Sequence, residues 1–288
     1  MGLVGVIGAG VMGAGVAQNA AESGHEVILI DLTEDVLQKA KEEIKKNIKF
    51  QGLFKKKDSR ILDEDILGRI TFTTDYEALR EVEFVVENVP EVWEVKKNVY
   101  TRLNEVCAED CILLVNTSCI SITKIAALCK QASNVIGVHF MNPVPLKSTV
   151  EAIRGFHTSE TTIQQTKDFL ESMDKEMILV NDYPGFVSNR LSHLLMNEAA
   201  FVVQDQVAEP RDVDEIFKKC FGHKMGPLET ADLIGLDTVV NSLDILYESY
   251  QDPKFRCAPL LRKMVEAGQH GRKSGKGFYD YNYGFVVN

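Results

Sequence analysis

The chain has 288 residues, of which 45% are hydrophobic and 26% charged, and its formal net charge is −10 at pH 7. This length allows two domains with sizeable cores, and no apolar run approaches the ~20 residues of a membrane span. The acidic balance argues against nucleic acid as a general partner. The six cysteines contain no CxxC pair, which is typical of a reduced cytoplasmic protein, and we expect no metal site.

The first 31 residues predict a strand, a glycine-rich turn, a helix and a second strand. These elements occupy residues 3–7, 8–13, 12–23 and 26–30, and an acid, Asp31, follows. In this order the Gly-x-Gly-x-x-Gly spacing is the dinucleotide-binding fingerprint, although a flavodoxin-like turn without a dinucleotide is the alternative. Gly8 allows the tight turn, Gly10 admits a pyrophosphate, and Gly13 lets helix and strand pack closely. Val11 and Met12 complete this predicted cofactor turn at the helix N-terminus.

Asp31 indicates which dinucleotide binds. Its carboxylate can accept protons from both ribose hydroxyls of the adenosine, whereas it would repel a 2′-phosphate. Leu32 and Thr33 supply no arginine to hold such a phosphate. The sequence therefore predicts NAD rather than NADP.

Strands and helices continue to alternate through the next 150 residues. The predicted strands are 69–73, 83–87, 112–116, 134–140, 149–153 and 177–180, and the predicted helices are 33–50, 94–107, 121–130 and 160–173. This alternation is typical of an α/β protein with a Rossmann-type, doubly wound, mostly parallel sheet. Strand signals then stop, and we expect helices at 186–207, 213–221, 230–250 and 259–267, in an all-α C-terminal domain. The expected domains are 1–184 and 185–288.

A lysine-rich segment interrupts the first domain. Residues 45–57 contain six lysines and two phenylalanines, in a predicted helical hairpin near 33–65. Such a segment is either a solvated hairpin tip or a docking surface for a phosphate-bearing ligand, and the residues alone favour the tip.

Polar residues follow the buried strands at the carboxyl edge of the sheet, where open α/β sheets bind ligands. Ser118 follows one strand, His139 ends the next, and Glu151 lies on the strand after that. Asn189 comes just past the predicted domain boundary. Each of them has a structural explanation, as a core histidine or as a turn or helix cap. Together they suit an oxidoreductase, because a histidine held by a carboxylate can accept a hydroxyl proton as hydride leaves carbon.

Several longer strings add a resemblance that covers the chain nearly end to end. They lie at residues 8–13, 116–118, 139–143, 184–190, 225–229, 234–237 and 271–279. In order and spacing they resemble the short-chain L-3-hydroxyacyl-CoA dehydrogenase family, and within it the bacterial 3-hydroxybutyryl-CoA dehydrogenases. The resemblance implies NAD-dependent oxidation of an acyl-CoA substrate, in fatty acid and butanoate metabolism, and a homodimer formed through the C-terminal helical domain.

The resemblance also implies a role for individual residues. His139 and Glu151 match the catalytic dyad, and Ser118 and Asn189 match residues that hold the substrate. Matches to residues that hold NAD fall, besides the glycine turn, at Asp31, Glu91, Lys96, Asn116 and Asn142. The hairpin matches the region that contacts coenzyme A, near Asn47, Lys55 and Lys56, which reverses the preference for a solvated tip.

Departures from the family pattern lie on the substrate side. A lysine before the catalytic glutamate has moved one place, to Lys147, and Cys119 replaces the second of two serines. Asn47 and Phe54 stand near the family's serine and lysine contacts to coenzyme A. A hydroxyacyl group tethered to an acyl carrier protein is therefore the alternative substrate. An NAD-binding protein without turnover is a minor alternative. The intact pair of His139 and Glu151 argues against it, because NAD binding alone would need neither residue.

Overall fold

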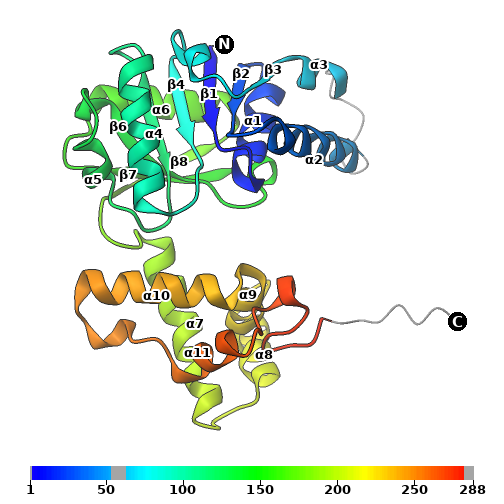
Figure 1. Cartoon of the computed structure of the whole chain (residues 1–288). Helices are drawn as coiled ribbons and strands as arrows, with labels where there is room; N and C mark the ends of the chain where they lie inside the picture. The colour runs from blue at the N-terminus through cyan, green and yellow to red at the C-terminus, as the bar shows by residue number, and fades with distance from the viewer. Residues whose placement is uncertain (1, 53–62, 282–288) are drawn as a thin grey trace, which may run out of the picture. The chain divides into compact units, whose positions relative to one another are not determined.

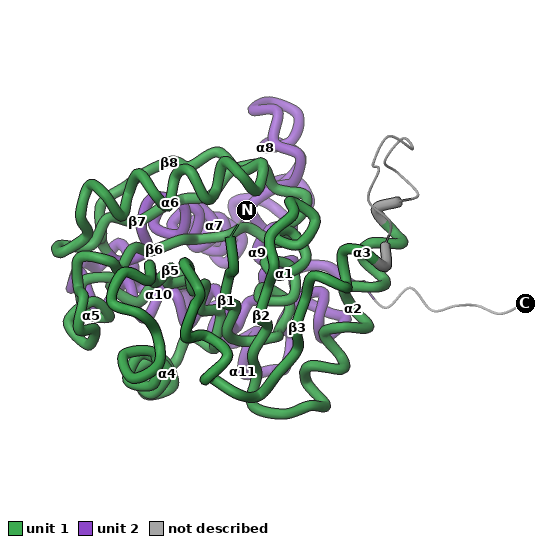
Figure 2. Tube along the Cα trace, turned by 90° about the horizontal axis from the view of Figure 1, so that it is seen from above, with its two compact units in different colours: residues 1–183 green, residues 184–288 purple. Residues whose placement is uncertain are grey.

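The computed structural model describes residues 2–52 and 63–281. The chain forms two compact units, the first ending at Tyr183 and the second beginning at Pro184 (Figures 1 and 2). In the described part of the chain, no helix is both long enough and apolar enough to cross a membrane.

The described part of the first unit holds one eight-stranded sheet, in the order β3-β2-β1-β4-β5-β6-β7-β8. Its strands are β1 (Leu3–Ile7), β2 (Glu26–Ile30), β3 (Ile70–Thr73), β4 (Phe84–Glu87), β5 (Ile112–Asn116), β6 (Val135–His139), β7 (Thr149–Arg154) and β8 (Glu176–Asn181). Neighbouring strands are parallel except β6 and β7, which are antiparallel. The predicted doubly wound, mostly parallel sheet is confirmed.

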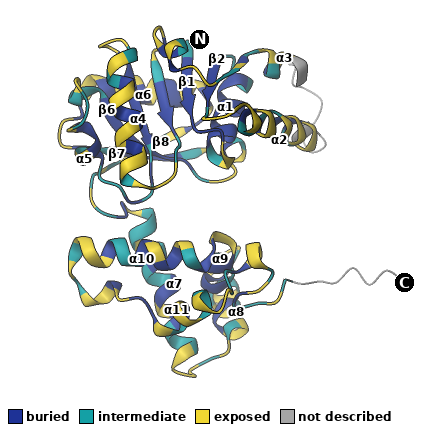
Figure 3. Ribbon diagram, in the orientation of Figure 1, coloured by how far each residue is buried: buried dark blue, intermediate teal, exposed yellow. Residues whose placement is uncertain are grey.

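Helices cover both faces of this sheet. They are α1 (Val11–Glu22), α2 (Glu34–Gly52), α3 (Asp63–Gly68), α4 (Trp93–Val106), α5 (Ile122–Ala126) and α6 (Glu160–Ser172). Figure 2 shows α1 and α6 on one face and α4 on the other. The central strands are continuous apolar runs because both of their faces are buried, as the dark strands of Figure 3 show. The helix expected at 121–130 ends at Ala126, and the chain continues in turns.

In the described residues of the second unit, all regular elements are helices. Its helices are α7 (Ser188–Gln204), α8 (Pro210–Phe221), α9 (Pro227–Ile234), α10 (Leu236–Tyr250) and α11 (Pro259–Glu266). Short 3-10 turns in the two units lie at Tyr76–Leu79, Ala132–Asn134, Val144–Leu146, Pro253–Phe255 and Arg272–Ser274. The prediction of one helix over 230–250 is wrong, because Gly235 (φ +105°) separates α9 from α10. This positive φ suits glycine.

Candidate active site

The turn between β1 and α1 has the shape that a dinucleotide needs. Gly8 has a φ of +90°, and its N–H donates to the carbonyl of Ile30 over 2.8 Å. A Cβ on Gly13 would lie 1.7 Å from the carbonyl oxygen of Gly8, so only glycine fits there. A Cβ on Gly10, in contrast, would meet nothing within 4 Å. Gly10 therefore faces open space at the N-terminus of α1, where free N–H groups favour an anion.

Asp31 lies beside this turn, directly after β2. Its Oδ2 accepts from the N–H of Ala9 over 2.6 Å, and its Oδ1 accepts from the N–H of Leu32 over 2.7 Å. The carboxylate is thereby fixed next to the glycines, while the Leu32 side chain is 83% exposed. An open cradle with an acid beside it fits the pyrophosphate and the adenosine ribose of NAD.

His139 and Glu151 form a hydrogen-bonded pair at the carboxyl end of β6. They lie directly opposite each other in the antiparallel register of β6 and β7, which points both side chains to the same face. The distance from Nδ1 of His139 to Oε2 of Glu151 is 3.0 Å, and each residue is only 8% exposed. A carboxylate at Nδ1 favours the tautomer that carries its proton on that nitrogen. The Nε2 atom is then the acceptor, and it lies 3.2 Å from Oγ of Ser118.

Asn116, at the end of β5, has a fixed orientation. Its Nδ2 donates to Oδ1 of Asn88 over 2.7 Å, and its Oδ1 accepts from the N–H of Phe140 over 3.3 Å. The same side chain therefore links the ends of three neighbouring strands, β4, β5 and β6.

Glu91 holds the turn that carries Ser118. Its Oε1 accepts from the backbone N–H groups of Ser118, Cys119 and Ile120, at 3.1, 3.0 and 3.2 Å. The hydroxyl of Thr117 donates to the same oxygen. Glu91 was predicted as an NAD contact, and in the structure its carboxylate orders the Ser118 turn.

Lys96 lies behind the site in a buried cluster. Its ammonium donates to both carboxylate oxygens of Glu87, at 2.9 and 2.8 Å, and to the carbonyl of Asn116, at 3.1 Å. Burial raises the pKa of Glu87, and the Lys96 charge opposes that rise. Burial and the Glu87 charge raise the pKa of Tyr100, whose hydroxyl donates to Glu87 over 3.1 Å. Lys96 thus holds the carbonyl of Asn116 by a hydrogen bond, and Glu87 balances its charge in a fully buried ion pair.

The sequence reasoning missed two supporting residues, Glu87 and Lys175. Glu87 ends β4 and pairs with Lys96. Lys175, just before β8, is buried and donates to the carbonyls of Val144 and Lys147, at 2.9 and 2.6 Å. It thereby holds the loop that follows Asn142. A charged residue directly at a strand boundary was the available signal for both.

The remaining predicted residues are more dispersed. Asn142 is exposed in the loop between β6 and β7, and Asn47 is half-buried on α2. Lys55 and Lys56 lie outside the described residues. Asn189 belongs to the second unit, where it is in the first turn of α7 and its carbonyl lies 2.9 Å from Nδ1 of His193. The described residues contain no group of three or more His, Cys, Asp or Glu side chains arranged to hold a metal ion.

Comparison with known proteins adds the family. The model described as 3-hydroxyacyl-CoA dehydrogenase, NAD binding domain, matches residues 3–183, and that for the C-terminal domain matches residues 185–281. A probable 3-hydroxybutyryl-CoA dehydrogenase of Deinococcus radiodurans is 44% identical, over 96% of this chain and 99% of the relative. A 3-hydroxybutyryl-CoA dehydrogenase of Clostridioides difficile is 41% identical, over 96% and 98%. The crystal structure of (S)-3-hydroxybutyryl-CoA dehydrogenase from Ralstonia eutropha has a TM-score of 0.92 at 37% identity, over 97% of this chain and 99% of that one.

The fold, the glycine turn and the matched NAD-binding domain define the class: the protein is an NAD-dependent oxidoreductase. It belongs to the 3-hydroxyacyl-CoA dehydrogenase family, which confirms the resemblance seen in the motifs.

Proposed function

We propose that the protein interconverts a short-chain 3-hydroxyacyl-CoA and the corresponding 3-ketoacyl-CoA, of the 3-hydroxybutyryl-CoA type. The observation that carries this proposal is the hydrogen-bonded series from Ser118 through His139 to Glu151. The relatives named 3-hydroxybutyryl-CoA dehydrogenase, at 41 and 44% identity over nearly the whole chain, support the substrate class.

In this mechanism His139 is the general base. Nε2 accepts the proton of the substrate hydroxyl as hydride leaves the carbon that bears this hydroxyl. Glu151 stabilises the imidazolium that forms. The Ser118 hydroxyl, 3.2 Å from Nε2, hydrogen-bonds the substrate oxygen and keeps it next to the base. Asn189 is assigned to the substrate by the family motif at residues 184–190. In the reverse direction His139 returns the proton.

NAD, when bound, supplies the hydride acceptor. The glycines of the β1–α1 turn, with Val11 and Met12, are the proposed pyrophosphate contacts, and Asp31 is the proposed ribose contact. Asn116, Glu91 and Asn142 are the proposed contacts near the reacting end. Lys96 is also a proposed residue of the cofactor site. It acts indirectly, by holding the carbonyl of Asn116.

The second unit is the proposed substrate and dimerisation domain. Its helix α8 exposes apolar side chains, with Ile216 51% and Phe221 68% exposed. Two large apolar residues on one short helix suit an interface between two copies of the chain. The first unit, with the proposed coenzyme A contacts at Asn47, Lys55 and Lys56, is the proposed NAD-binding domain.

The test compares one short 3-hydroxyacyl group on two carriers, coenzyme A and an acyl carrier protein. NADH formation from 3-hydroxybutyryl-CoA with a kcat/KM of at least ~10⁴ M⁻¹s⁻¹ is the expected result. His139→Gln is expected to lower kcat by about 10²–10⁴-fold, because it removes the base, and to leave NADH affinity nearly unchanged.

Other results would replace the proposal. Oxidation of the carrier-bound group alone would establish the alternative suggested by Lys147 and Cys119. Binding of NADH without turnover of either substrate would make the protein a non-catalytic NAD-binding protein. Near-normal turnover by His139→Gln would remove that residue from the mechanism.

A further inference from the structure

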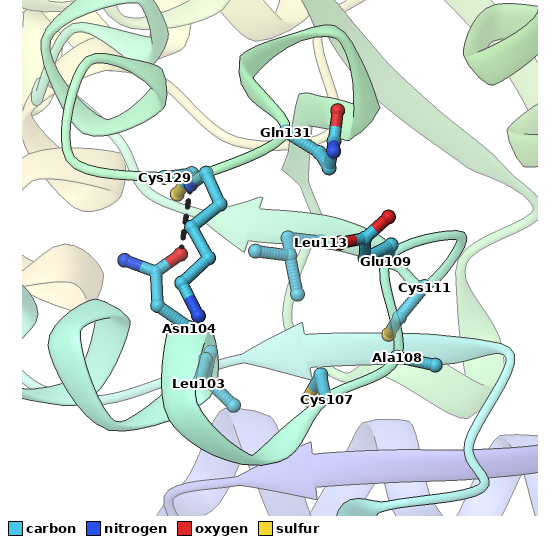
Figure 4. Close-up of a pocket in the computed structure, with 10 residues that line it drawn as sticks. Leu103, Asn104, Cys107, Ala108, Glu109, Cys111, Leu113, Cys129 and Gln131 are labelled. Atoms are coloured by element: carbon cyan, nitrogen blue, oxygen red, sulfur yellow. Dashed lines mark hydrogen bonds between the residues drawn. The ribbon is translucent and has the colours of Figure 1, made fainter.

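Three cysteines line one small cavity at the turn between α4 and β5, and neither residue of the dyad is in its lining. Cys107 directly follows α4, Cys111 directly precedes β5, and Cys129 follows α5. Their cavity has a volume of about 70 Å³, and Lys130 and Glu109 are the charged groups among its lining residues (Figure 4). The proposed reaction uses none of these thiols.

The backbone brings two of the three thiols together. The N–H of Cys107 bonds to the carbonyl of Leu103 over 2.9 Å and ends α4, and the N–H of Cys111 bonds to the carbonyl of Ala108 over 3.2 Å. The second bond closes a four-residue turn, which reverses the chain and returns Cys111 beside Cys107. The side chains of Cys107 and Cys111 both line the cavity, and the Cys111 thiol donates to the carbonyl of Ile112 over 3.9 Å. Figure 4 shows this pair on the side of the cavity away from Cys129.

The three thiols differ in access and in acidity. Cys107 is half-buried, whereas Cys111 is only 4% exposed. The neighbouring Cys111 thiol lowers the pKa of Cys107, and Cys107 together with burial raises the pKa of Cys111. Burial raises the pKa of Cys129 to about 12, and its thiol donates to the carbonyl of Ile125 over 3.6 Å. Cys107 is therefore the nucleophile of the group, with a protonated thiol next to it.

We propose that Cys107 and Cys111 form a dithiol site that a peroxide oxidises reversibly to an intramolecular disulfide. The Cys107 thiolate attacks one peroxide oxygen, the O–O bond breaks, and Cys107 becomes a sulfenic acid as alkoxide or hydroxide leaves. The Cys111 sulfur then attacks the sulfur of Cys107, the S–O bond breaks, and the hydroxide leaves with the proton of Cys111 as water. The two thiols lose two electrons, which the peroxide gains. A dithiol reductant reverses the change by thiol–disulfide exchange.

This disulfide lies at the amino end of β5, whereas Asn116 ends the strand and Ser118 follows it. The five residues of the strand separate the two ends by roughly 17 Å. Oxidation is therefore expected to leave turnover within about twofold of the reduced enzyme, and the site protects Cys107 from irreversible oxidation rather than switching the reaction off.

The experiment treats the reduced full-length enzyme with hydrogen peroxide, alkylates the remaining thiols, and digests it with an endoprotease that cleaves after glutamate. Cleavage after Glu109 separates Cys107 from Cys111, so the proposal predicts that their fragments stay joined until a dithiol reductant is added. Mass spectrometry measures the joined pair, and fragmentation of its peptides shows which of Cys111, Cys119 and Cys129, all in the fragment 110–151, lacks the alkyl group. In Cys111→Ser, Cys107 is expected to stay as a sulfenic acid that dimedone traps, whereas Cys129→Ser, a matched change in the same cavity, should form the disulfide as the wild type does.

Two results would overturn the proposal, and both are seen in the unsubstituted enzyme, so neither depends on the folding of a variant. One is conversion of Cys107 to sulfinic acid without any joined fragment. The other is a joined fragment in which Cys129 or Cys119, and not Cys111, lacks the alkyl group. Both readouts are masses, so they are independent of the substrate that the enzyme proves to use.

Discussion

At the scale of single residues, Asp31 sets the expected choice between NAD and NADP. Its carboxylate is fixed by the N–H groups of Ala9 and Leu32. Asp31→Ser with Leu32→Arg should lower kcat/KM for NAD and raise it for NADP, each by about tenfold or more. A phosphate would lose a repulsive neighbour and gain a guanidinium. The measurement is the rate with each cofactor at a saturating substrate concentration.

Leu32→Arg alone is the control for this change, because it leaves the carboxylate in place and should keep NAD as the preferred cofactor. A wild-type enzyme that already prefers NADP would contradict the interpretation of Asp31.

The roles of individual residues could be predicted from the sequence where they depend only on neighbouring residues in the chain. The roles of the glycines follow from the turn itself, and the strand ends that carry Asn116 and His139 are predicted from the apolar runs before them. The pairing of Lys96 with Glu87 could not be predicted, since it depends on how α4 packs against β4. A buried ion pair of this kind depends on tertiary structure and leaves no periodic signal in the chain.

At the scale of elements, the β1–α1 turn offers a matched pair of substitutions. Gly13→Ala should destabilise the fold by about 2 kcal/mol or more, because its Cβ would overlap the carbonyl of Gly8. Gly10→Ala should leave the fold nearly as stable, because φ is −67° and the space beside it is open. It should nevertheless weaken NADH binding, since the methyl group would occupy the space expected for the pyrophosphate. Thermal unfolding and NADH titration measure the two effects.

The two substitutions control for each other. Normal NADH affinity in Gly10→Ala would mean that the pyrophosphate does not bind against this turn, and unchanged stability in Gly13→Ala would mean that the turn can open without cost.

Most helices and strands could be predicted from the periodicity of apolar residues. The wrong prediction of one helix over 230–250 shows what this periodicity cannot detect. Residues 230–250 keep an apolar spacing that suits one helix, yet the chain breaks at Gly235. A glycine is tolerated inside many helices, so its presence alone does not predict an end. The break lies in the backbone of Gly235, whose φ of +105° is outside the helical region.

At the scale of the whole molecule, one reversal of direction creates the dyad. The β6 and β7 strands are antiparallel in a sheet whose other neighbours are parallel, and this register sets His139 opposite Glu151. The alternation of strands and helices predicts the class of sheet, but it is silent on the direction of β7, because the short connection from β6 holds no helix. The missing crossover helix between these two strands was the signal for an antiparallel pair.

The proposed dimer depends on α8, and it gives the last prediction. The C-terminal half of this helix exposes Ile216 and Phe221, and the Phe221 ring lies 5.4 Å from that of Phe217. If two copies bury this surface, Phe221→Glu should weaken dimerisation by about 10²-fold or more, because an aromatic anchor becomes a carboxylate that loses its water on association. Sedimentation velocity over a range of protein concentrations measures the change.

Lys219→Glu is the matched control, since it introduces the same carboxylate two residues away, on the opposite side of the helix from Phe221 and on a side chain that pairs with Glu215. It should sediment as the wild type does. A wild-type enzyme that remains a monomer at micromolar concentration would contradict the dimer itself. A Phe221→Glu enzyme that still dimerises normally would move the interface to another surface, because a buried, unpaired carboxylate at the contact is incompatible with unchanged association.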